Sequence, residues 1–231
     1  MSKAKSTSRI KAEKSTVLYR NYYLMFAMLF FLTGLFAIQT ASASAFKYQK
    51  VAVLQVGNAY MQQQVNFSQA ETAFENQNYA YSARILKPLA LNGHPRSQYL
   101  LATQYDLGLG VKRNVSRSFH WYKKAARAGI TIAQHNLAVA YAQGNGVDAD
   151  LEKAVTWWER AANAGNTDSQ YNLGIIYAAG RDSIKPDMKK AMKWWRMAAM
   201  SGDPAAQFNL GAIYANGIGI SNQTCKASHW W

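Results

Sequence analysis

Four similar helical segments of this chain each open with a glycine followed five residues later by a glutamine, at nearly constant spacing. The pairs are Gly93/Gln98, Gly129/Gln134, Gly165/Gln170 and Gly202/Gln207. Successive glycines are 36, 36 and 37 residues apart, and a period between about 20 and 50 residues is typical of stacked repeat proteins. Because such proteins usually present an extended binding surface, the period favours a binding function over catalysis.

The residues around each glutamine predict an amphipathic helix. Counted from the glutamine, small residues stand at −1 and +4, a leucine at +3 and a tyrosine at +7, all on one side of a helix. The leucines and tyrosines are Leu101, Leu137, Leu173, Leu210, Tyr105, Tyr141, Tyr177 and Tyr214. Each of these first helices is expected to end at a glycine, since glycine adopts the left-handed conformation without cost. The glycines are Gly108, Gly144, Gly180 and Gly217.

A second helix is predicted to run back in each unit. Small residues flank a pair of aromatic residues on its apolar face, and we expect these pairs in the core. The pairs are Trp121-Tyr122, Trp157-Trp158 and Trp194-Trp195. Asp150 and Asp187 lie near the starts of the last two helices, where N-caps or first-turn acids are favoured. The loop 180–187 carries the inserted residue behind the longer step.

These residues resemble the Sel1-like repeat family, which is related to the tetratricopeptide repeats. The fullest copy of the family pattern begins at Ala133-Gln-His-Asn-Leu137-Ala138 and ends at Gly165. The resemblance implies an all-α fold, a right-handed α/α solenoid of about four to five antiparallel helix pairs with the last pair incomplete. We expect the solenoid at 68–231, starting at the capping box Ser68-Gln-Ala-Glu71. Residues 46–67 are expected to form a linker or a helix.

The N-terminus predicts export. Of 26 Lys and Arg, six lie in the first 20 residues against one acid, and an uncharged apolar run follows at 24–38. Small residues two apart then close the segment at Ala41-Ser-Ala-Ser-Ala45. A basic head, an apolar run and such a site are typical of a secretory signal peptide, here 1–45. The alternative is an uncleaved inner-membrane anchor at 22–38. With the signal, the protein is expected to be periplasmic or secreted.

The C-terminal segment contains two further features. Cys225 is the only cysteine, so an internal disulfide is excluded, and an unpaired thiol near the end of the chain is expected to be idle. Lys226-Ala227 and Trp230-Trp231 align with the first half of a second helix, after which the sequence stops. This pattern predicts either a truncated unit or a bare apolar edge that self-associates.

The sequence predicts no catalytic, cofactor or metal site. The histidines His94, His120, His135 and His229 lie in different units, without the clustering that metal ligation requires. We expect them to be surface or packing residues. The paired glycines of the loops end helices and follow no strand, so they are not dinucleotide-binding fingerprints. An enzyme acting on cell-wall-related compounds is disfavoured because the paired cysteines of such relatives are absent.

Binding is better supported by the face of the first helices opposite the leucines and tyrosines. By analogy with tetratricopeptide arrays, this face would be concave and could hold an extended peptide, with amides bonding its backbone and rings packing its side chains. The candidate partner-binding residues are Tyr99, His135, Asn136, Tyr171, Asn172, Phe208 and Asn209. Thr103, Val139, Ile175 and Ala212 stand one turn further along. The alternative is that the rings pack between adjacent first helices and the asparagines satisfy local backbone groups.

Charge defines a second surface on the second helices. Two basic clusters could contact an anionic membrane surface or an acidic envelope polymer, whereas nucleic acid is not expected as a partner of an exported chain. The clusters are Lys112, Arg113, Arg117, Lys123, Lys124 and Arg127, and Lys185, Lys189, Lys190, Lys193 and Arg196. The preferred hypothesis is therefore an exported, non-enzymatic protein that binds a protein partner, as adaptor or regulator of an envelope or signalling complex. The alternative is an envelope-surface binding protein.

Overall fold

The structure is a computed structural model that describes residues 43–216. This range contains nine helices and no β-strand, which confirms the all-α fold. The long helix α2 (Ala43–Glu75) is followed by eight helices of 13 residues each. They are α3 (Tyr79–Leu91), α4 (Pro95–Leu107), α5 (Val115–Arg127), α6 (Thr131–Gln143), α7 (Leu151–Asn163), α8 (Thr167–Ala179), α9 (Met188–Met200) and α10 (Pro204–Asn216).

The described residues end before several of the predicted features. The expected signal peptide up to residue 42, the alternative anchor at 22–38, and the C-terminal residues 217–231 with Cys225 lie outside the described range. Among helices α2 to α10, none has the length and apolarity needed to cross a membrane.

The chain divides into two units between Gln62 and Gln63, a position inside α2. The prediction that a helix starts at Ser68 is wrong, because α2 continues through this residue and Ser68 is exposed within it. Residues 46–67 contain no proline and a single glycine, Gly57, so nothing in this segment interrupts the helix. Because Ser68 lies inside the helix, the backbone N–H groups around it can bond to carbonyl oxygens of the preceding turn. A capping box, which satisfies unpaired N–H groups at a helix start, is therefore not needed there.

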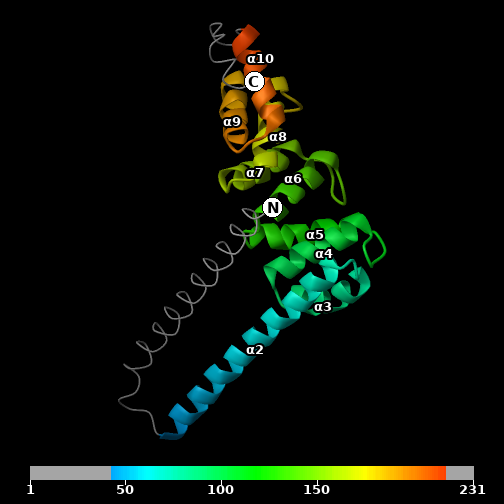
Figure 1. Cartoon of the computed structure of the whole chain (residues 1–231), viewed down its shortest axis with the longest axis vertical. Coiled ribbons are helices and arrows are strands. Elements are labelled where there is room, and N and C mark those ends of the chain that lie inside the picture. The colour runs from blue at the N-terminus through cyan, green and yellow to red at the C-terminus, as the bar shows by residue number, and fades with distance from the viewer. Residues whose placement is uncertain (1–42, 217–231) are drawn as a thin grey trace, which may run out of the picture. The chain divides into compact units, whose positions relative to one another are not determined.

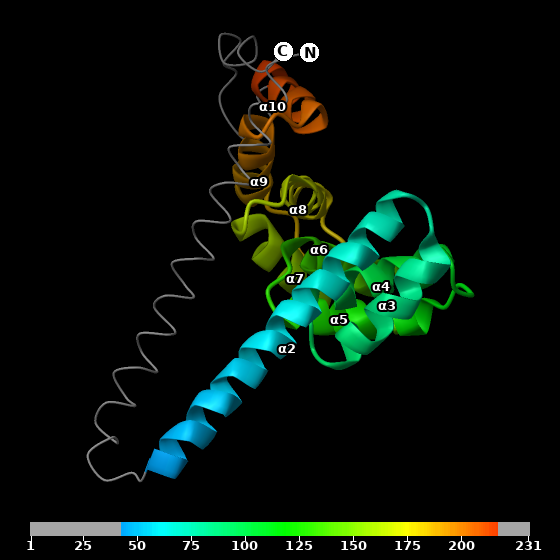
Figure 2. The ribbon, with the colours of Figure 1, turned by 60° about the horizontal axis from the view of Figure 1, so that its bottom comes forward.

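Helices α3 to α10 belong to the second unit and form the repeats. Each packs against the next one in sequence, and Figures 1 and 2 show these neighbours side by side. One continuous core runs through the unit. Its largest fully buried apolar side chains are the leucines Leu86, Leu101, Leu137, Leu173 and Leu210. The predicted burial of the first-helix leucines is thus confirmed. The aromatic pairs of α5 and α9 and Trp158 of α7 belong to the same core, whereas Trp157, which was predicted there, is only half-buried against it.

The glycine and glutamine period has a direct structural cause. Each glutamine side chain donates its Nε2 hydrogen to the penultimate carbonyl of the preceding second helix, as Gln170 does to Ala162 at 3.0 Å. The other three bonds are Gln98 to Ala90, Gln134 to Ala126 and Gln207 to Ala199. The glycine between the two helices has φ of +89° or +90° in all four copies, a conformation that disfavours any residue with a Cβ. The pair therefore fixes the junction between units.

The loops inside the units are fixed in a different way. At Gly146 a Cβ would overlap the backbone of Val115, the first residue of the preceding second helix, so glycine allows the loop to lie directly against it. The loop after α8 lacks this glycine and carries the inserted residue. Ser183 Oγ instead donates to Glu152 Oε1 of α7, at 2.6 Å. The extended loop therefore contacts the preceding second helix through side chains.

The predicted caps of the second helices are confirmed. Asp150 Oδ1 accepts a hydrogen bond from the Lys153 backbone N–H at 2.9 Å, and Asp187 does the same for Lys190 at 3.0 Å. The backbone N–H of each of these acids also donates a hydrogen bond to the carbonyl oxygen of a first-helix tyrosine. Asp150 bonds in this way to Tyr141. One residue thus caps the second helix and holds the end of the first helix.

Candidate functional site

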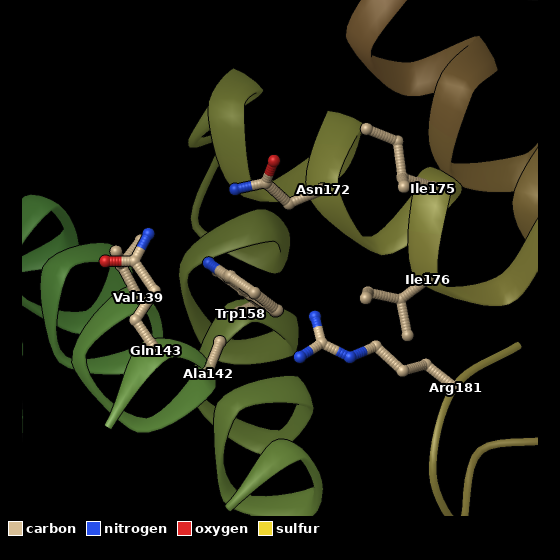
Figure 3. Close-up of a pocket in the computed structure, with 8 residues that line it drawn as sticks. All are labelled: Val139, Ala142, Gln143, Trp158, Asn172, Ile175, Ile176 and Arg181. Atoms are coloured by element: carbon tan, nitrogen blue, oxygen red, sulfur yellow. The ribbon is translucent and has the colours of Figure 1, made fainter. Parts of the chain in front are cut away.

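Two hollows open between neighbouring first helices. The larger, with a volume of about 210 Å³, is lined from α6, α7, α8 and the following loop, and is named here the α6–α8 hollow (Figure 3). The smaller, about 60 Å³, is lined from α4, α5, α6 and the following loop, and is named the α4–α6 hollow. Val139 of α6 lines both of them. The two hollows are therefore adjacent on the face formed by α4, α6 and α8, which we call the first-helix face.

The two hollows are copies of one another at the spacing of the repeat. Six lining residues of the α4–α6 hollow coincide with lining residues of the α6–α8 hollow after a shift of 36 positions. The equivalent pairs are Asp106/Ala142, Tyr122/Trp158, Asn136/Asn172, Val139/Ile175, Ala140/Ile176 and Asn145/Arg181. The hollow is thus a property of the repeat and not of one irregular contact.

The α6–α8 hollow combines apolar walls with polar groups. Val139, Ala142, Ile175 and Ile176 supply the aliphatic surface, and the indole of Trp158 adds an aromatic one. Figure 3 shows Arg181 extending from its loop, with its guanidinium directed toward the side formed by Trp158 and Ala142. The hollow thus offers a small, open surface of mixed apolar and polar character.

Tyr122 occupies the corresponding place in the α4–α6 hollow. Its hydroxyl lies 3.2 Å from Thr103 Oγ1 and also forms a hydrogen bond with the Asn136 side chain. Burial raises the pKa of the Tyr122 phenol to about 12, an effect that the nearby Asp106 carboxylate increases. The hydroxyl therefore stays neutral near neutral pH.

The structure brings together some of the predicted partner-binding residues. Asn136 and Asn172 line equivalent hollows, and so do Val139 and Ile175 from the position one turn further along. Asn172 forms no side-chain hydrogen bond with the described part of the chain. Asn136 in contrast bonds the Tyr122 hydroxyl, as in the alternative in which asparagines satisfy local groups.

The remaining predicted residues line neither hollow. Tyr99 packs beside Tyr122 with ring centroids 6.1 Å apart, and Tyr171 is half-buried against the core. His135 Nδ1 and Ser169 Oγ of the next unit share a hydrogen bond of 2.9 Å. Phe208 is 66% exposed on α10, and Asn209 beside it is half-buried. The aromatic column is thus partly a contact between helices and partly open surface.

Sequence reasoning missed several residues of the hollows. Arg181, Asn145 and Asp106 were not predicted, although the 36-residue shift from Asn145 to Arg181 is visible in the sequence. The same shift applied to the loops, and not only to the helices, would have aligned them. Trp158 was predicted as a core residue, and its 4% exposure confirms this, but its ring also lines the hollow.

The histidines of the described range have separate surroundings. No group of three or more His, Cys, Asp or Glu side chains in residues 43–216 could hold a metal ion. His94 caps α4, because its Nδ1 accepts a hydrogen bond from the Ser97 backbone N–H at 3.2 Å. His120 is exposed beside Trp121, and His229 lies outside the described range.

Many of the basic side chains on the second helices lie over aromatic rings. Lys124 is 4.7 Å from the Trp121 ring centroid, and Lys193 is 5.1 Å from that of Trp194. Arg117 and Lys190 lie over tyrosines of the first helices. These cations cover apolar surface in addition to carrying charge.

The fold and the repeat period have counterparts among known proteins. The family model described as Sel1 repeat matches residues 95–130, 131–166, 167–203 and 204–231, which together make up more than half of the chain. The chain belongs to the Sel1 repeat family. The four matched segments begin at or beside the starts of α4, α6, α8 and α10, so the family's unit is the helix pair seen here. No curated protein matches the sequence of this Sel1 repeat protein.

Two solved structures show the same architecture. A Sel1 repeat protein from Oxalobacter formigenes is 29% identical with a TM-score of 0.65, and the match covers 71% of this chain and 66% of that one. The protein c5321, a protective antigen of uropathogenic Escherichia coli with an SLR fold, is 27% identical with a TM-score of 0.70. That match covers 76% of this chain and 39% of c5321. This Sel1 repeat protein therefore spans only part of the length of both.

Membership of the family carries a general function. Sel1 repeats typically mediate protein–protein interactions, and their solenoids are generally non-enzymatic scaffolds. The α/α solenoid predicted from the sequence of this Sel1 repeat protein is confirmed by the helix pairs and by both structures.

The burial of His135 predicts that the stability of this Sel1 repeat protein depends on pH. Burial lowers the pKa of His135 below 6.5, with Asp168 and Asn166 opposing the shift. As the pH falls from about 7.5 to about 5.5, the unfolded chain therefore binds the proton before the folded chain does, and stability is lost. The urea midpoint should fall over this range and should fall less in His135→Gln. His94, whose pKa burial also lowers, retains part of the effect in that variant. An unchanged pH dependence in His135→Gln would contradict the assignment.

Proposed function

We propose that this protein is exported and holds a segment of a partner protein on its first-helix face, without catalysing a reaction. In this role it would act as an adaptor or regulator of an envelope or signalling complex. Export is supported by the basic head, the apolar run and the small residues of the N-terminal sequence.

The recurrence of the hollow with the repeat period is the observation that carries this proposal. Side chains of an extended segment project at regular intervals, and a surface with equivalent hollows at regular intervals is suited to receive them. Asn172 offers an unused amide beside such a hollow, which could bond the backbone of the segment. The second-helix face offers exposed charge, but many of its cations lie over the protein's own rings.

Site-specific photo-crosslinking of the full chain in its native cells tests this proposal. A photoreactive residue replaces Ile175, which lines the α6–α8 hollow and is 40% exposed. The matched control replaces Thr156, an exposed residue of α7 that lines neither hollow. A covalent product with one protein is expected from the Ile175 position, in the periplasmic or secreted fraction, and not from the Thr156 position.

The same experiment with Asn172→Ala measures the amide's contribution. Because Asn172 bonds nothing in the described chain, this variant should fold normally and yield several-fold less product. Equal products from Ile175 and Thr156, or a product that stays in the cytoplasmic fraction, would contradict the proposal.

A further inference from the structure

The two equivalent hollows differ in charge. Arg181 lines the α6–α8 hollow, where the α4–α6 hollow has Asn145. The α4–α6 hollow in turn contains the carboxylate of Asp106, where its counterpart has Ala142. Adjacent sites of similar construction thus present a cation in one unit and an anion in the other. Such an arrangement allows the surface to distinguish ligands by the order of their charges.

The polar groups of the α6–α8 hollow are largely unused by the fold. The Arg181 side chain is 61% exposed, and its ion pair with the neighbouring Asp182 is long, at 3.7 Å, and solvent-exposed. An exposed ion pair of this kind contributes little to the stability of the fold, so the Arg181 guanidinium can leave Asp182 to bind a ligand. Gln143 accepts a hydrogen bond from Asn145 Nδ2 through its oxygen, which leaves its amide hydrogens for a ligand. With Asn172, three side chains that line the hollow have donor groups not used by the described part of the chain.

Trp158, the aromatic residue of this hollow, contains an unsatisfied polar group. Its Nε1–H group is buried and has no hydrogen-bond acceptor in the described part of the chain. An uncompensated N–H dipole raises the electrostatic potential around it, and the low dielectric of the interior strengthens the effect. In the α4–α6 hollow the equivalent hydroxyl of Tyr122 is already bonded to Thr103 and Asn136. The two hollows therefore also differ in how well their aromatic group is satisfied.

We propose that the α6–α8 hollow receives the carboxylate of an aspartate or glutamate side chain from an extended segment of a partner protein. This inference rests on the proposed function. The guanidinium of Arg181 can bind a carboxylate through two parallel hydrogen bonds. Val139, Ile175 and Ile176 provide apolar contacts for the methylene groups of the acidic side chain.

The neighbouring hollow fixes which position of the segment is acidic. Because Val139 lines both hollows, a segment that fills one continues directly over the other. Asp106 disfavours a second carboxylate there and favours a basic or hydrogen-bond-donating side chain. The acidic residue therefore lies within the segment, next to a residue that is not acidic.

Selection from a random-peptide library displayed on phage tests this inference with the full chain as the target. The wild-type protein should enrich peptides that share an internal Asp or Glu at one aligned position. Selection on Arg181→Glu should replace that acid by Lys or Arg, whereas the matched charge change Lys189→Glu, on the exposed start of α9, should leave the preference unchanged. A peptide from the wild-type selection should bind Arg181→Gln at least about tenfold more weakly, since hydrogen bonds to charged groups contribute about 1.5 kcal/mol or more.

The outcomes separate the inference from the proposed function. Enriched peptides that depend on Asn172 but show no acidic preference, or whose preference is unaffected by Arg181→Glu, overturn the inference alone. A preference for a free C-terminal carboxylate, lost when the synthetic peptide is amidated, also overturns it. If the wild-type protein enriches no peptide at all, both the inference and the peptide-binding function are overturned.

Discussion

Gly146→Ala is expected to destabilise the protein by about 3 kcal/mol, against about 1 kcal/mol for Gly129→Ala. Both glycines have positive φ, +75° for Gly146 and +89° for Gly129, so a left-handed alanine is unfavourable at either position. They differ in their surroundings. A Cβ at Gly129 would meet no heavy atom within 4 Å, whereas at Gly146 it would overlap the Val115 backbone. Backbone atoms of a packed helix start cannot move aside as a flexible side chain can.

Urea unfolding followed by circular dichroism measures both free energies of unfolding. Gly129→Ala serves as the control because it has the same conformational cost without the steric one. If the two variants lose equal stability, the close approach of the loop to α5 is not a determinant of the fold. The difference between them, and not the absolute loss, is the result that matters.

Trp158→Ala should cost about 3–5 kcal/mol, the usual range for removing a large buried ring. The adjacent Trp157→Ala should cost about 1 kcal/mol, because this ring is half-buried and lies against the Arg160 guanidinium at 4.4 Å. Trp158 is 4% exposed and belongs to the core. Neighbouring residues of the same type therefore differ severalfold in their contribution, according to the helix face they occupy.

The variant Trp158→Phe distinguishes the contribution of the aromatic ring to stability from that of the indole N–H group. It should cost less than Trp158→Ala, because the ring contacts are largely kept and a buried donor without an acceptor is removed. Thermal unfolding of the three variants under one set of conditions provides the comparison. A loss in Trp157→Ala as large as that in Trp158→Ala would contradict the assignment of faces.

The repeated units were predictable because their determinants are local. A helix of 13 residues, its cap and its terminal glycine depend on residues within a few positions of each other, as Asp150 and Gly144 illustrate. The same holds for the burial of Leu137, which follows from its spacing to Tyr141 on one helix face. The continuous α2 was not predictable in the same way. A capping sequence at Ser68 resembles a helix start even when the preceding residues are already helical.

The hollows were only partly predictable because they depend on how units stack. Asn136 and Asn172 were found from their place on the first helices, but each hollow is completed by a residue from a loop. Arg181, like Asn145 at the equivalent position, lines its hollow from the loop after a first helix. The contact of His135 with Ser169 likewise joins residues 34 positions apart, and nothing in the local pattern of either residue indicates it.

The bonds between units have a consistent direction, and this has a consequence for how such a chain can change in length. Each glutamine reaches back to the preceding second helix, and the loop glycine Gly146 lies against that same preceding helix. A unit such as 131–166 therefore carries within its own sequence the groups that join it to whatever unit comes before. Tandem duplication of that segment would add a unit that already contains the glutamine and glycine needed to contact the unit before it, and a second helix that the next unit can contact in the same way. The array would gain one more hollow, and the ligand it accommodates would grow by a corresponding step.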